Sequence, residues 1–186
     1  LADTAILKNF WFNFVDLNKD KILSFMVLPW KIHLSSLSVQ AIGYLFFAIV
    51  LLGLINLIRN NWLFSYSFVF LFLFAFTMLA NDLPPFSTVV DLLREKVPLF
   101  GQVFRVPFTK FAVLASLSYS VLLAVGISKV LKASTSLWRN SAKWIVLIIS
   151  IFLIIFSFPV FKGNLLYDLV KLEIPSEYFD VMRFFG

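Results

Sequence analysis

The sequence predicts an all-α polytopic membrane protein with about four transmembrane helices and one short interfacial amphipathic helix. Of its 186 residues, 61% are hydrophobic and only 14% are charged, whereas soluble domains average about 25% charged residues. The mean hydropathy of +0.93 excludes a soluble enzyme, a disordered tail and a secreted disulfide scaffold. We expect the sequence to be a fragment of a larger chain, because it opens without methionine and stops within a segment that looks unfinished.

Four stretches without Asp, Glu, Lys or Arg are long enough to cross a bilayer, for which a helix needs roughly 20 apolar residues. Only Arg59, Asn60 and Asn61 separate the first two stretches, so these form a hairpin. The competing interpretation is four buried core helices, but these would leave too few polar residues to cover a soluble surface. The predicted transmembrane region 37–161 contains the spans 37–58, 62–80, 111–128 and 144–161.

The basic residues predict how the chain is oriented. The two loops that would lie on one side carry five basic residues and no acid: Arg59, Lys129, Lys132, Arg139 and Lys143. Cytoplasmic loops are enriched in Lys and Arg, so this side is predicted to be cytoplasmic and both chain ends extracytoplasmic. The net charge of +6 is then mainly an orientation signal, and no aromatic-basic surface accompanies it that would indicate nucleic-acid binding.

The first and last segments are predicted to lie outside the membrane. Residues 1–36 form an external loop or interfacial segment, and His33, the only histidine in the chain, is predicted to be structural. Residues 162–186 are predicted to start a truncated external domain, with a strand LVKLEI followed by an amphipathic helix SEYFDVMRFF that begins at Ser176.

The middle outer segment contains the predicted interfacial helix, residues 87–97. Pro84 and Pro85 end the preceding helix, and Ser87 is the predicted N-cap. The apolar residues share one arc of the helix: Val89, Val90, Leu92, Leu93 and Val97. The charged residues share the opposite arc: Asp91, Arg94 and Glu95. Such a helix lies in the plane of the interface, with its apolar side among the acyl chains.

Two cations, Arg105 and Lys110, follow this helix at the mouth of the third predicted span. Phosphate recognition requires Arg or Lys close to the headgroup, so the two residues could clamp the phosphate of a lipid-linked substrate. The alternative is that both are ordinary interfacial anchors whose aliphatic stems lie along the lipid.

The chain resembles the later membrane portion of bacterial polytopic glycosyltransferases of the GT-C superfamily, and within it the arabinofuranosyltransferase-like group and related membrane proteins. The matching pieces are FRVPFTKF (Phe104 to Phe111), IPSEYFDVMRFF (Ile174 to Phe185) and the order of loops and spans. The resemblance implies transfer of a sugar from a polyprenyl-phosphate donor to a cell-envelope glycan or lipid outside the bacterial cytoplasmic membrane, often with a divalent cation. The catalytic acid of such enzymes lies in the first external loop, so no residue here inherits that role.

The resemblance suggests partners for the outer residues: the lipid bilayer and a lipid-linked sugar donor, with no protein partner indicated. The candidates for the lipid phosphate are Arg105, Lys110 and Arg94, and those for sugar hydroxyls or a divalent ion are Asp82, Asp91 and Glu95. The alternative function is a non-catalytic membrane protein or a component of lipid or polysaccharide export. The predicted spans contain no ionisable acid or base, which weakens the case for an ion-coupled transporter.

Overall fold

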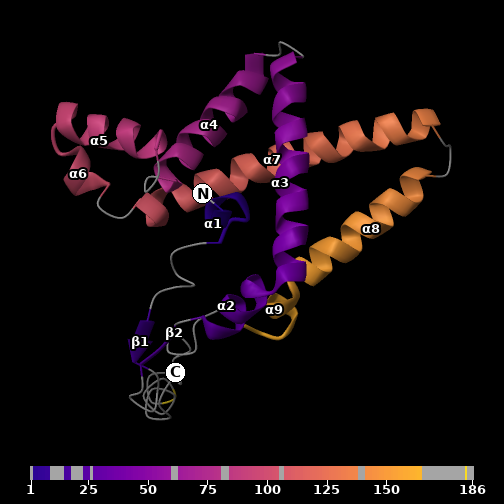
Figure 1. Ribbon diagram of the computed structural model, residues 1–186, viewed down its shortest axis with the longest axis horizontal. Coiled ribbons are helices and arrows are strands. Elements are labelled where there is room, and N and C mark those ends of the chain that lie inside the picture. Colours follow the sequence, from indigo (N-terminus) through magenta and orange to yellow (C-terminus); the bar gives the residue numbers. More distant parts are fainter. Residues whose placement is uncertain are drawn as a thin grey trace.

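The computed structural model describes residues 2–8, 15–17, 23–25, 27–59, 63–80, 84–104, 107–137, 141–164 and 183. This part of the chain is helical apart from one short antiparallel hairpin of strands β1 (Val15–Leu17) and β2 (Leu23–Phe25), which the sequence did not predict (Figure 1). The helices are α1 (Ala2–Ala5), α2 (Leu28–Ser35), α3 (Leu37–Arg59), α4 (Leu63–Leu79), α5 (Phe86–Lys96), α6 (Phe100–Val103), α7 (Pro107–Leu137), α8 (Ser141–Phe156) and α9 (Phe158–Phe161).

Two helices are long and apolar enough to cross a membrane. They are α3 and the stretch Lys110–Ser134 of α7. Helices α4 and α8 contain the shorter apolar segments Tyr66–Leu79 and Ala142–Phe156. All four predicted spans therefore overlap helices, but by length and composition only two of these helices qualify as membrane spans, fewer than the predicted four.

Helix α7 extends well beyond the predicted span 111–128. It has 31 residues and continues through Lys129 and Lys132 to Leu137. The prediction ended the span at the first charge, but Lys, Ala, Ser and Leu all continue a helix at little cost, and no Gly or Pro interrupts this stretch. The basic residues therefore project from a rigid helix and not from a loop.

The span predicted at 144–161 is broken near its end, because Pro159 interrupts the helix. Proline has no N–H to donate to the carbonyl of Ile155 four residues earlier, and α8 ends at Phe156. The Nε2 atom of His33 lies 3.0 Å from the Ile155 oxygen and 3.2 Å from the Phe156 oxygen. Because carbonyls only accept, Nε2 carries the proton and donates, which supports the structural role predicted for this histidine.

Helix α5 begins one residue earlier than predicted and has a different cap. Pro85 occupies the N-cap position without a side-chain hydrogen bond, so Ser87, the predicted N-cap, lies inside the helix. Proline already has a φ near the helical value, and it can precede the first turn without a capping hydroxyl. The helix ends at Lys96 with Val97 in an extended conformation.

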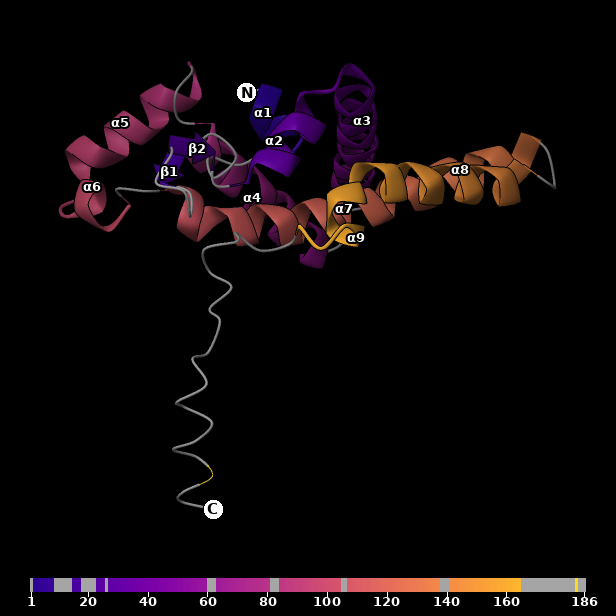
Figure 2. The ribbon, with the colours of Figure 1, turned by 90° about the horizontal axis from the view of Figure 1, so that it is seen from below.

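Helices α3 and α7 cross at a point where glycines face each other's backbone. A Cβ atom on Gly53 would overlap the carbonyl oxygen of Leu122, and one on Gly126 would overlap the carbonyl oxygen of Ile49. Small residues let helix backbones approach this closely, as is common in membrane proteins. Figure 1 shows α3 running across α7, and Figure 2 shows α3 nearly end-on while α7 and α8 lie across the view.

A buried cluster surrounds this crossing and attaches α4 to it. Its four members come from three helices: Val50 of α3, Phe72 of α4, and Tyr119 and Leu122 of α7. Val50 and Leu122 are completely buried. Packing at the crossing therefore holds α3, α4 and α7 together as one unit.

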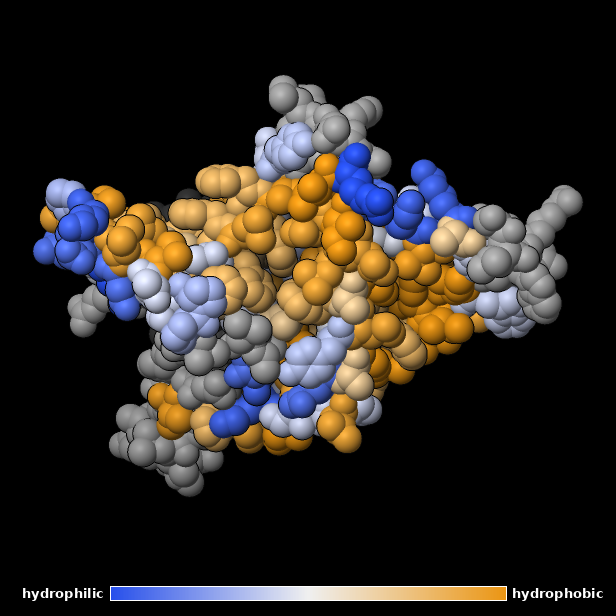
Figure 3. All heavy atoms as spheres, turned by 45° about the horizontal axis from the view of Figure 1, so that its top comes forward, coloured by the Kyte–Doolittle hydropathy of each residue, from blue (hydrophilic) through white to orange (hydrophobic). Residues whose placement is uncertain are grey.

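Large apolar side chains cover much of the outside of this unit (Figure 3). Only 28% of the apolar window of α3 and 33% of that of α7 is buried, although the core helix of a soluble protein would be mostly buried. Strongly exposed apolar side chains include Val113 of α7 at 72% and Phe70 of α4 at 70%. An apolar surface of this extent exceeds what a water-soluble monomer usually exposes.

The strand and helix predicted between Leu169 and Phe185 lie outside the described residues, except for Arg183.

Candidate functional site

The segment that carries the predicted site packs against the ends of α4 and α7. Val90 of α5 and Phe100 of α6 are buried in a cluster with Met78 of α4 and Phe111 of α7. The Phe104 ring contacts both neighbours, with centroids 4.8 Å from Phe100 and 5.3 Å from Phe111. We call α5, α6 and the first turns of α7 the platform; these apolar contacts fix its position on the bundle.

The apolar side of α5 is divided between protein and surroundings. Val90 is 2% exposed, and Leu93 packs against the same cluster. Val89, Leu92 and Val97 remain exposed. The expectation that the whole apolar arc faces acyl chains is therefore wrong for Val90 and Leu93, because these two side chains pack against the ends of α4 and α7.

Lys110 is exposed at the start of the apolar stretch of α7. Its amino group donates to the backbone carbonyl of Val103, near the end of α6, and lies 5.4 Å from the centroid of the Phe104 ring. A lysine ammonium has three donors, so this hydrogen bond leaves donors for another anion or carbonyl. The platform thus holds one cation in place at its edge.

The charged side of α5 is exposed and internally paired. Arg94 lies 3.5 Å from Asp91, and Lys96 lies 3.0 Å from Glu95. Exposed ion pairs contribute little to stability, so a ligand could exchange with either partner at low cost. Among the described residues Arg94 and Lys110 have separate partners, Asp91 and the Val103 carbonyl, and both cations belong to the platform.

Arg105 and Asp82, the remaining predicted site residues, lie outside the described residues. A metal site also finds no support among the described candidates. Asp91 and Glu95 are each paired with a basic neighbour, and the described residues contain no group of three or more His, Asp or Glu side chains that could hold an ion. The divalent cation implied by the resemblance has no such ligand group among the described residues, and we derive no step through it.

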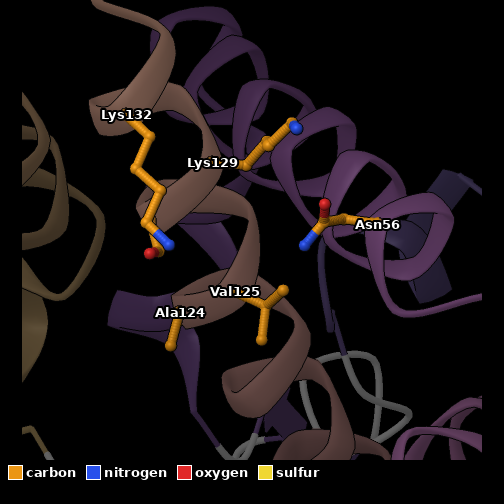
Figure 4. A pocket seen from close by; sticks show the side chains of 6 residues that line it. Asn56, Ala124, Val125, Lys129 and Lys132 are labelled. Atoms are coloured by element: carbon orange, nitrogen blue, oxygen red, sulfur yellow. The ribbon is translucent and has the colours of Figure 1, made fainter. Parts of the chain in front are cut away.

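Sequence reasoning missed a second candidate site, a pocket of about 440 Å³ between α3 and α7. Its polar lining residues are Asn56 of α3 and Ser128, Lys129 and Lys132 of α7, and its apolar ones are Ala124 and Val125. Figure 4 shows Asn56 projecting from α3 toward α7; of the two lysines on α7, Lys129 extends upward toward α3 in this view and Lys132 extends downward along α7. The sequence analysis used the two lysines only to predict the orientation of the chain. The sequence features that could have indicated the pocket are their spacing of three residues on a helix and the polar Asn56 within a predicted span.

Comparison with other proteins adds no assignment to these two sites. No protein-family model, curated protein or solved structure matches the chain.

Proposed function

We propose that the chain is part of an integral membrane glycosyltransferase of the GT-C type. It transfers a sugar from a polyprenyl-phosphate donor to a cell-envelope glycan or lipid on the extracytoplasmic side of a bacterial cytoplasmic membrane. The observation that carries this proposal is the placement of Lys110 and Arg94, exposed cations on a platform that is packed against the ends of apolar helices. A lipid-linked phosphate needs cations at the interface and an apolar surface for its chain.

The proposed multi-pass topology has α3, α4, α7 and the α8–α9 unit crossing the membrane. On the diagonal from lower left to upper right in Figure 1, the platform at the left and α2 and α9 at the bottom lie on one side, and the C-terminal ends of α3 and α7 at the top and right lie on the other. A bilayer normal along this diagonal separates the predicted outer segments from the predicted cytoplasmic ends. Contacts of α2 support this grouping, since His33 donates to carbonyls at the end of α8 and Trp30 donates to the Asn164 carbonyl, just after α9, at 2.7 Å.

The lengths of α3 and α7, the two longest helices, agree with such a placement. At about 1.5 Å per residue, α3 and the apolar stretch of α7 are ~34 Å and ~37 Å long. Each can therefore tilt by roughly 30–40° and still cross a hydrocarbon core of about 30 Å. Opposite tilts of that size accommodate the steep crossing of α3 and α7.

In the proposed mechanism the platform recognises the donor, and the acid that catalyses transfer comes from another part of the enzyme. Lys110 and Arg105 contact the lipid phosphate, and Arg94 exchanges its partner Asp91 for a phosphate oxygen. The released carboxylate, together with Glu95 and Asp82, accepts hydrogen bonds from sugar hydroxyls. Lost or weakened phosphate contacts would reduce donor binding and transfer together.

The topology can be tested with single cysteines, because the chain has none of its own. In intact cells a membrane-impermeant maleimide should label Lys96→Cys on the platform, but Lys143→Cys only after the membrane is permeabilised. Labelling of both positions in intact cells, or of neither, contradicts the proposed orientation.

The function is tested in the full-length protein by replacing Arg105 and Lys110 with glutamine. We expect transfer from the polyprenyl-phosphate donor to fall at least about tenfold, while membrane insertion is retained. Lys162→Gln is the matched control, since it removes a cation from the same predicted face outside the platform. Unchanged transfer in the double variant refutes the proposed phosphate site. Absence of any transfer by the unaltered protein favours the non-catalytic or export alternative.

A further inference from the structure

The pocket between α3 and α7 lies one helical turn beyond the glycine crossing. Asn56 follows Gly53 by three residues, and Lys129 follows Gly126 by three. At the glycines the backbones touch, and because the helices cross at an angle they diverge beyond this point (Figure 1). The residues that follow the glycines line an open pocket toward the C-terminal ends of both helices.

Hydrogen-bond donors surround this space from both helices. Lys129 and Lys132 provide two ammonium groups, Asn56 provides an amide from the opposite helix, and Ser128 provides a hydroxyl. None of the described residues that line the pocket is acidic. Charge-assisted hydrogen bonds from lysine to phosphate oxygens are short and strong, so the donor set favours a phosphate group over a neutral or cationic ligand.

The apolar surroundings of the pocket favour a phosphate that is attached to a lipid. Ala124 and Val125 contribute apolar lining, and Ile55, next to Asn56 on α3, is 50% exposed. Such a surface suits an acyl chain that descends from the headgroup into the bilayer. Basic pockets between transmembrane helices at the cytoplasmic side are typical sites for anionic headgroups.

We infer that the pocket lined by Asn56, Ser128, Lys129 and Lys132 binds the phosphate group of an acidic membrane lipid. The site is separate from the platform, since its residues come from the C-terminal parts of α3 and α7, whereas the platform contains only the first turns of α7 and no part of α3. The volume of about 440 Å³ lies within the range of small-ligand pockets and accommodates a headgroup. The lipid bridges α3 and α7 on the side of the crossing where their backbones diverge.

The test is native mass spectrometry of the full-length protein purified in detergent and titrated with phosphatidylglycerol or phosphatidylcholine. The unaltered chain should retain one phosphatidylglycerol in preference to phosphatidylcholine. In the double variant Lys129→Gln, Lys132→Gln, affinity for phosphatidylglycerol should fall at least about tenfold. The matched control Arg59→Gln, Lys143→Gln removes the same charge from the same predicted side but outside the pocket, and it should retain the preference.

A second variant covers the case in which the double lysine variant does not fold. Ala124→Leu fills the pocket without changing its charge, and it should also weaken retention of phosphatidylglycerol. Equal retention by the unaltered chain and Ala124→Leu, or equal losses in the two double variants, overturns the site. If inorganic phosphate is retained as tightly as phosphatidylglycerol, the proposal of a lipid ligand is wrong and the pocket binds free phosphate.

Discussion

Replacing Gly53 with alanine is a direct test of the crossing between α3 and α7. The new Cβ would lie 2.9 Å from the carbonyl carbon of Leu122 and 3.0 Å from the amide nitrogen of Gly126, and closer still to the Leu122 oxygen. All three atoms belong to backbone, so no side-chain rotation relieves the overlap. One helix must move away from the other.

The expected cost combines two opposing effects. Overpacking in a tight core costs about 1–3 kcal/mol, and the upper end applies because the obstacle is a helix backbone. Retreat of α7 also loosens its contacts with Val50, since a gap of about 1 Å forfeits a quarter to a half of the dispersion attraction. Alanine gains about 1 kcal/mol over glycine in a helix interior. Gly53→Ala should therefore destabilise the chain by about 2 kcal/mol, although in an open helix it would be stabilising.

Reversible unfolding with SDS in mixed micelles, followed by circular dichroism, measures this difference. The chain provides graded controls. A Cβ on Gly101 would meet nothing within 4 Å, so Gly101→Ala should be neutral or stabilising by about 0.5 kcal/mol. At Gly43 the nearest atoms belong to the side chains of Ile6 and Phe156, which can adjust, and its alanine variant should lie between the two.

The double variant of Gly53 and Gly126 adds a second criterion. Both methyl groups push the same two helices apart, so the second should cost less than it does alone, with a coupling of about 1 kcal/mol. The reasoning is refuted if Gly53→Ala is as stable as Gly101→Ala. Strict additivity of the two crossing variants would also contradict a shared contact point.

Three further predictions concern other parts of the structure. His33→Phe should destabilise the chain by about 1–3 kcal/mol in SDS unfolding. The loss should be smaller in a chain that also carries Pro159→Ala, because residue 159 then has a backbone N–H that can donate to the Ile155 carbonyl. Equal losses with and without Pro159→Ala would contradict the role of His33 as donor to that carbonyl. Val90→Ala should speed hydrogen exchange in α5 and reduce stability by about 2 kcal/mol, whereas Val89→Ala, at an exposed position, should change stability by less than about 0.5 kcal/mol. Equal effects of the two variants would contradict the packing of the Val90 side of α5 against the protein. Gly163 has a φ of +77°, so its replacement by alanine should cost about 1 kcal/mol; a neutral result in thermal unfolding would argue against that backbone conformation.

The sequence predicted the helices well because an apolar run without charges is a local property. It predicted their ends less well, since Lys129 ends an apolar stretch without ending a helix, whereas Pro159 does interrupt one. The contact between Gly53 and Gly126 depends on residues 73 positions apart, and no local pattern indicates that pairing. The hydrogen bond from His33 of α2 to the end of α8 could not be predicted either, because nothing in the local sequence indicates that these two distant segments lie side by side.

The same limit applies to the candidate sites. Lys110 was singled out as a cation at a helix mouth, and its exposure agrees with that position. Its hydrogen bond to the Val103 carbonyl depends on how α6 folds back toward α7, which periodicity does not specify. The pocket at Lys129 was missed because it requires Asn56 from another helix.

The glycine crossing is a contact point about which α3 and α7 can rotate relative to each other. Asn56 and Lys129 lie on the C-terminal side of it, each ~4.5 Å along its helix from Gly53 or Gly126 at about 1.5 Å per residue. On the N-terminal side, Lys110 lies ~24 Å along α7 from Gly126, and the first residue of α3 lies at the same distance from Gly53. If both helices stay straight, a given change of their separation at the pocket is multiplied about fivefold at the opposite ends, where α7 joins the platform and α3 joins α2.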